Sequence, residues 1–200
     1  MHKTIPQSSA ATVGLAGDRR VQLAFFLAIV FLYWLALYLY VPTLPTYAQT
    51  KTDNLALVGA ILAQYGLWQA IVRLPIGIVS DWIGRRKPFI LVGMIFAGAG
   101  AYVMGSAGNA EGVLIGRAIT GVAAGTWVPL VVAFSRLFPP DEAVRASATL
   151  TLAGSIGRVL ATSATGPLNN LGGYGLPFLL ATGVAAMALL VTAAAPDKRV

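Results

Sequence analysis

The chain has 200 residues, of which 57% are hydrophobic and 10% charged, with a formal net charge of +7 and a mean hydropathy of +0.75. A soluble domain typically carries about 25% charged residues, so a water-covered globular domain is excluded and the lipid bilayer is the expected solvent. The cations lie in short clusters between apolar runs and form no basic face, which argues against nucleic acid as a partner. The chain has no cysteine and one histidine, and we find no nucleophile–base pair, metal cluster or phosphate loop. An enzyme, a metal site and a cofactor are therefore not expected.

Six apolar segments follow a polar stretch at residues 1–20, which lacks periodicity and is expected to be a disordered cytoplasmic tail. About 20 consecutive apolar residues span a bilayer as a helix. Only helices satisfy their own backbone in lipid, so the sequence predicts an all-α membrane protein with a six-span domain at residues 21–195. The expected helices cover residues 21–41, 54–80, 88–106, 112–137, 144–165 and 176–195. A Gly/Pro/Asn turn is expected at residues 166–173, and a cytoplasmic end at residues 196–200.

The distribution of Lys and Arg predicts how the chain crosses the membrane. With the N-terminus in the cytoplasm, the outer segments hold only Lys51, and three of the 14 cations lie within helices. This positive-inside asymmetry places both ends in the cytoplasm, in a multi-pass protein of the inner cell membrane. The cations in the cytoplasmic segments are Lys3, Arg19, Arg20, Arg85, Arg86, Lys87, Arg136, Arg145, Lys198 and Arg199.

The loop between the second and third expected helices carries the most specific motif. Residues 77–88 read Gly-Ile-Val-Ser-Asp-Trp-Ile-Gly-Arg-Arg-Lys-Pro. They resemble the G-x-x-x-D-x-x-G-R-[RK] signature of the major facilitator superfamily of secondary transporters, which lies between the same two spans. In that family the motif braces the loop against the other half of the transporter and helps to gate alternating access. The resemblance implies this role for Gly77, Asp81, Gly84, Arg85, Arg86 and Lys87.

Within this motif, Asp81 needs a partner, and Arg85 or Arg86 is expected to supply it. Gly77 is expected to permit close helix approach, and Gly84 a tight turn. The alternative is that the three cations only anchor the loop by the positive-inside effect. That alternative explains the cations but not Gly77, Asp81 and Gly84.

Arg117 lies in the fourth expected helix. With Gly121 it resembles the family's R-x-x-x-G element. An arginine inside a span costs about 2.5–3.5 kcal/mol on insertion scales, so we expect Arg117 to face the bundle interior or a wet cavity. The alternative is that it lies near the outer end, where its side chain reaches the interface and pairs with Glu111.

The fifth expected helix carries a polar stripe, since Ser, Thr and Arg recur at spacings of three or four residues on one face. A stripe around an arginine near mid-membrane depth suggests a water-filled substrate path. Hydrogen bonds from the hydroxyls to their own helix are the alternative, but these leave the arginine unexplained. The stripe consists of Ser147, Thr151, Ser155, Arg158, Thr162 and Thr165.

Gln69 and Arg73 lie four residues apart in the second expected helix. Either they form another wall of the path, or Arg73 reaches the inner headgroups, about 12 Å away at 1.5 Å per residue from Asp81. No carboxylate lies at mid-membrane depth, because Asp81 and Glu111 are at span ends. A substrate bound here is therefore expected to be anionic or rich in hydrogen-bonding groups.

The family resemblance covers residues 21–195 and implies only the first six of the twelve spans that members normally have. We expect a secondary transporter of a small solute that works by alternating access, as an N-terminal half or a truncated form. Its partners would be the bilayer, a small-molecule substrate and a second six-helix half. That half would lie in a longer form of the chain, in a separate chain or in a second copy. The alternative is a non-transporting membrane scaffold, partner subunit or inactive remnant.

Overall fold

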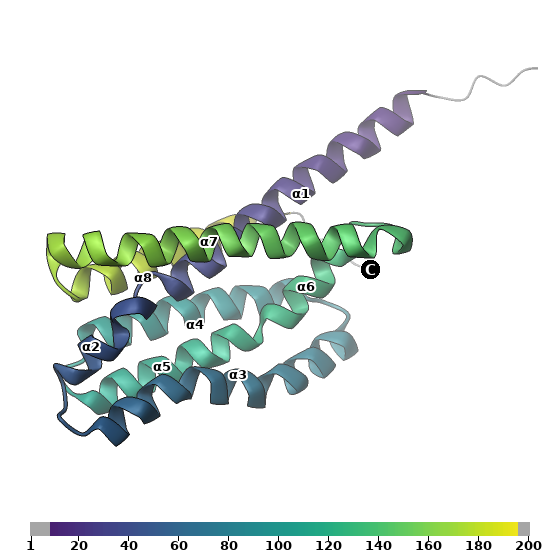
Figure 1. Ribbon diagram of the computed structural model, residues 1–200. Coiled ribbons are helices and arrows are strands. Elements are labelled where there is room, and N and C mark those ends of the chain that lie inside the picture. Colours follow the sequence, from purple (N-terminus) through teal and green to yellow (C-terminus); the bar gives the residue numbers. More distant parts are fainter. Residues whose placement is uncertain (1–8, 196–200) are drawn as a thin grey trace, which may run out of the picture.

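The computed structural model describes residues 9–195, a bundle of long helices with no strand in that part of the chain (Figure 1). Five segments of it are long and apolar enough to cross a membrane: Arg19–Gln49, Leu55–Ile83, Lys87–Ser106, Ala110–Ser135 and Gly175–Ala194. The helices are α1 (Ser9–Tyr38), α2 (Leu44–Gln49), α3 (Leu55–Ile83), α4 (Lys87–Ser106), α5 (Ala110–Gly125), α6 (Trp127–Ser135), α7 (Ala143–Gly172) and α8 (Gly175–Ala194). Two 3-10 turns, η1 (Val41–Thr43) and η2 (Pro140–Glu142), complete the order.

The sixth expected span is α7, which has 30 residues and is therefore about 45 Å long. It lies alongside the other helices in the bundle (Figure 1). It is not among the five apolar segments because its polar stripe lowers its hydropathy. The all-α membrane fold is thus confirmed, with one helix more polar than the other spans.

Two helices end earlier than expected, and a following proline explains each end. Proline has no N–H, and its ring clashes with the carbonyl four residues before it. α1 ends at Tyr38, four residues before Pro42, and not at residue 41. The fourth expected helix is divided, since α5 ends at Gly125, four residues before Pro129, and α6 starts at Trp127.

Three other expected boundaries were wrong. α1 begins at Ser9, so residues 9–20 of the expected disordered tail are helical. This stretch contains alanine and no proline, which favours a helix that extends toward the N-terminus. Residues 1–8 and 196–200 lie outside the described part. α3 continues to Ile83, which places Asp81 in its last turn. α7 passes through the expected turn at residues 166–173 as far as Gly172, because neighbouring groups in a membrane bundle can satisfy the carbonyl that Pro167 leaves free.

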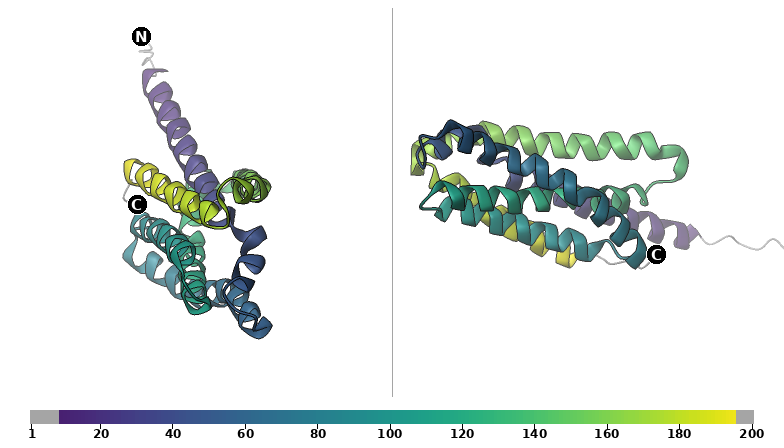
Figure 2. Two further views of the ribbon diagram at one scale, coloured as in Figure 1. Left: turned by 90° about the vertical axis from the view of Figure 1, so that its left-hand side faces the viewer. Right: turned by 90° about the horizontal axis from the view of Figure 1, so that it is seen from below.

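The helices form two groups that meet along α4 and α8 (Figure 2). In one group α1 packs against α7 and α8, and in the other α5 packs against α3 and α4. The two groups correspond when the first three spans are exchanged for the last three, that is, α1 for α5, α3 for α7 and α4 for α8. The contacts of α5 with α3 and α4 then become those of α1 with α7 and α8. This two-fold pattern is that of inverted repeats, for which the sequence showed no convincing signal.

The cationic loops gather at one end of the bundle, on the right in Figure 1. Lys87 Nζ donates hydrogen bonds to the carbonyls of Ala193 (2.9 Å) and Ala195 (2.6 Å) at the end of α8. Arg19 Nε donates to the carbonyl of Leu137 (2.9 Å) in the α6–α7 linker. The α3–α4 loop, the α6–α7 linker and the end of α8 therefore lie on one side, as the expected orientation requires.

Candidate functional site

The loop motif forms one ion pair at the end of α3. Arg86 Nη2 lies 2.6 Å from Asp81 Oδ1; the arginine side chain is 9% exposed and the carboxylate 62%. Arg85 is exposed and has no ion pair with any described carboxylate. Of the two candidate partners of Asp81, the structure therefore selects Arg86.

The motif's glycines differ in what they contribute. Gly84 ends α3 in the left-handed conformation (φ +68°), and its N–H donates to the carbonyl of Asp81 (3.2 Å), so the expected tight turn is present. A Cβ at Gly77 would lie 3.5 Å from Val128 Cγ1, an ordinary contact. The close helix approach expected at Gly77 is therefore absent. Lys87 caps α8, a role that sequence analysis missed because the two segments are far apart in the chain.

Arg158 lies near the middle of α7 and turns toward α1. Its guanidinium carbon is 4.6 Å from the centre of the Trp34 ring and 6.0 Å from that of Tyr38. Arg158 Nη2 donates to Ser155 Oγ (3.1 Å). None of the described carboxylates pairs with it. Within the described part of the chain, the positive charge is therefore held by aromatic faces and one hydroxyl, without a counter-ion.

Sequence analysis missed this aromatic platform. Trp34 and Tyr38 are one helical turn apart on α1, with ring centres 5.5 Å apart, and Trp127 of α6 lies 5.1 Å from Trp34. The four-residue spacing on α1 predicts a shared face. It does not reveal which residue of α7 meets that face.

The polar stripe of α7 divides into two parts. Thr162 and Thr165 donate to carbonyls of their own helix, those of Arg158 (2.9 Å) and Ala161 (3.0 Å). The back-bonding interpretation is therefore correct for these two. Thr165 also donates to the carbonyl of Leu39 (2.7 Å), tying α7 to the end of α1.

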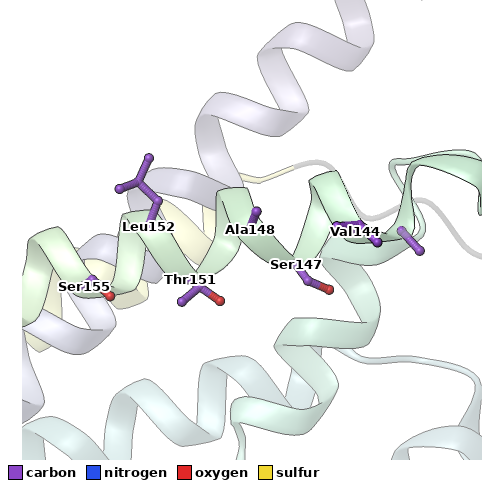
Figure 3. A pocket seen from close by; sticks show the side chains of 7 residues that line it. Val144, Ser147, Ala148, Thr151, Leu152 and Ser155 are labelled. Atoms are coloured by element: carbon purple, nitrogen blue, oxygen red, sulfur yellow. The ribbon is translucent and has the colours of Figure 1, made fainter.

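The other part of the stripe lines an open pocket of about 720 Å³ along α7. The hydroxyl-bearing residues of its lining, Ser147, Thr151 and Ser155, lie on one side of the helix (Figure 3). Apolar residues of the same helix complete the lining: Ala143, Val144, Ala148 and Leu152. Arg158 follows one turn after Ser155 and donates to its hydroxyl. The structure thus joins Thr151, Ser155 and Arg158 into one continuous polar surface.

Arg117 is 7% exposed and lies inside the bundle. Its guanidinium carbon is 4.4 Å from the centre of the Tyr65 ring of α3. It makes no ion pair with Glu111 or any other described carboxylate. The interior position expected for Arg117 is confirmed, and the alternative of pairing with Glu111 is wrong.

Gln69 and Arg73 do not line the α7 pocket. Gln69 is half-buried and Arg73 exposed on α3. The helices α3 and α7 belong to different packing groups. The structure therefore separates these two residues from the Ser155–Arg158 surface.

Together, the fold and the apolar helices define a multi-pass membrane protein with two arginines inside its spans. The family model described as Major Facilitator Superfamily matches residues 26–199. The chain belongs to this superfamily.

Individual relatives agree with this assignment. Over 199 residues the chain is 27% identical to a chloramphenicol efflux pump of Mycobacterium tuberculosis (strain ATCC 25618 / H37Rv), covering 97% of this chain and 48% of the relative. It is 35% identical to the inner membrane transport protein YajR of Escherichia coli (strain K12) over 88 residues, 44% of this chain and 19% of the relative. The chain thus spans about half the length, or less, of these relatives.

Solved structures show the same fold. The crystal structure of a human organic anion transporter matches with a TM-score of 0.76 at 19% sequence identity, covering 90% of this chain and 48% of that one. A peptide transporter in complex with sulfate matches with a TM-score of 0.73 at 18% identity, covering 86% and 37%.

Proposed function

We propose that the chain forms the N-terminal six-helix half of a secondary transporter, which moves a small solute by alternating access. The observation that carries this proposal is Arg158, an arginine near the middle of a membrane-length helix. It follows, by one helical turn, the hydroxyls of an open pocket whose surface is otherwise mostly apolar. A charge at that depth is expensive, so it is retained where it meets water or a ligand. Family membership and the efflux pumps among the relatives support the proposal.

The chemistry of this surface favours an anionic or hydrogen-bond-accepting solute. Arg158 carries donors only, and Ser147, Thr151 and Ser155 add hydroxyls along the same face. Trp34 and Tyr38 offer aromatic faces beside the guanidinium, on which a planar group can stack. The organic anion transporter with the same fold is consistent with this choice.

A second six-helix half completes the path in this proposal. Thr151 and Ser147 are exposed on the pocket side of α7, and hydroxyls turned toward lipid lack partners. A facing half would enclose them in a cavity, and the loop motif around Asp81 and Arg86 would brace the two halves on the cytoplasmic side. Both described ends of the chain would then face the cytoplasm at the inner membrane.

The experiment compares solute accumulation in cells of an efflux-deficient host that express the natural polypeptide. The solutes are chloramphenicol and a panel of small aromatic carboxylates. Arg158→Ala is expected to lower transport at least tenfold at unchanged membrane abundance, because a hydrogen bond to a charged group contributes about 1.5–3 kcal/mol. Arg145→Ala is the matched control, since it removes an exposed arginine from the same helix.

Unchanged transport by Arg158→Ala would refute the role of this surface. A wild-type protein that is abundant in the membrane but moves none of these solutes would favour a non-transporting scaffold, partner subunit or inactive remnant.

A further inference from the structure

Arg117 is a buried cation whose hydrogen-bonding capacity is not used. Its Nε and Nη1 atoms are buried and have no hydrogen-bond partner within residues 9–195. Thr120, one turn further along α5, donates its hydroxyl to the carbonyl of Arg117 (2.9 Å), and its oxygen accepts from neither Nε nor Nη1. The side chain is 7% exposed. A charge buried this far needs an acceptor or a counter-ion.

Two tyrosine hydroxyls around Arg117 are also unpaired. Tyr65 lies under the guanidinium, and its buried hydroxyl has no hydrogen-bond partner among residues 9–195. Tyr40, which follows α1, is fully buried, and Arg117 and Thr120 lie beside its hydroxyl within reach of a hydrogen bond. No hydrogen bond with good distance and angle joins this hydroxyl to a described residue. Three elements of the fold thus bring unused donors to one place. The arginine can only donate, and each phenol can donate as well as accept.

We propose that the Arg117–Tyr40–Tyr65 cluster binds a compact anion, either a halide ion or a carboxylate group. The Tyr65 ring covers one face of the guanidinium but cannot accept from the N–H groups at its edge. An anion placed at this edge would accept from Arg117 and from the two hydroxyls and would compensate the buried charge. The cluster lies about 10 Å from the start of α5 at 1.5 Å per residue, in the half of the bundle opposite the cationic loops.

This site is separate from the Arg158 surface and does not depend on the proposed transport. A free ion and the carboxyl group of a larger solute offer the same chemistry to Arg117. Two salts distinguish these sources: chloride tests the free ion, and acetate tests a carboxylate group. Isethionate, a bulkier sulfonate, serves as the reference anion.

The test measures the melting temperature of the purified full chain in lipid nanodiscs, by circular dichroism, in the sodium salts of the three anions at equal ionic strength. A ligand that binds only the folded state raises the melting temperature in a concentration-dependent way. Chloride, acetate or both are expected to raise it by several degrees, with saturation. Arg117→Gln should abolish the shift, and Arg145→Gln, which removes an exposed arginine of α7, should retain it.

Tyr65→Phe and Tyr40→Phe provide a second route if Arg117→Gln does not fold, because both keep the ring. Each is expected to raise the concentration of anion at half-saturation several-fold. Equal melting temperatures in the three salts would overturn the proposal. A shift of unchanged size in Arg117→Gln, or unchanged half-saturation in both tyrosine variants, would do the same.

Discussion

Replacing Gly116 by alanine is expected to force α4 and α5 apart. A Cβ at this position would lie 2.8 Å from the carbonyl oxygen of Gly100 and 2.9 Å from the backbone nitrogen of Met104. Both are backbone atoms of the facing helix, which cannot rotate away as a side chain can. Widening the first distance to an ordinary 3.4 Å separates the helices by about 0.6 Å, and overpacking of this kind costs about 1–3 kcal/mol.

Gly59→Ala is the matched control for this substitution. Gly59 lies on α3, and a Cβ there would meet no atom within 4 Å. Alanine at such a position gains about 1 kcal/mol of helix propensity. The difference in the free energy of unfolding between the two variants therefore isolates the packing cost. It can be measured by sodium dodecyl sulfate titration in mixed micelles, followed by circular dichroism. If the free energies of unfolding of the two variants agree within about 0.5 kcal/mol, the close packing of α4 on α5 is refuted.

Three further substitutions test individual contacts by the same unfolding assay. Gly84→Ala should destabilise the protein by about 1–2 kcal/mol, because its positive φ penalises any Cβ; wild-type stability would mean that the turn is built differently. Asp81→Asn should cost about 1 kcal/mol, since it leaves the largely buried Arg86 without its carboxylate while Asp81 itself is well solvated; no loss, at low or high salt, would count against the ion pair. Tyr33→Phe removes the hydroxyl that donates to the carbonyl of Ala123 (3.0 Å) and should cost about 0.5–1.5 kcal/mol, and a neutral result would exclude that bond between α1 and α5.

The spans were predictable because lipid as a solvent leaves few options for the backbone. The residues at which the helices end were less predictable from the sequence. The prolines were visible, but a proline acts on the carbonyl four residues earlier, which is why α1 ends at Tyr38 and α5 at Gly125. Conversely, Pro167 did not end α7. Whether a membrane helix tolerates a proline depends on neighbouring groups that the local sequence does not contain.

The candidate site was predictable in part for a similar reason. Helical periodicity places Thr151, Ser155 and Arg158 on one face, and the structure joins them. The contact of Arg158 with Trp34 is formed between α7 and α1. Such a contact depends on how two helices pack, and a single sequence does not specify that packing.

The central claim, that the Thr151–Arg158 surface faces a water-filled path, is tested most directly by cysteine accessibility. The chain contains no cysteine, so Thr151→Cys and Leu160→Cys each introduce a unique thiol. Thr151 lines the pocket, whereas Leu160, which is 51% exposed on the same helix, is not among the residues that line it. Leu160 follows Thr151 by about two and a half helical turns and therefore lies on the opposite face of α7. The reactive species is the thiolate, which requires a polar environment. A membrane-impermeant thiol reagent should therefore label Thr151→Cys much faster than Leu160→Cys in intact membranes. Equal labelling, or faster labelling at residue 160, would contradict the account.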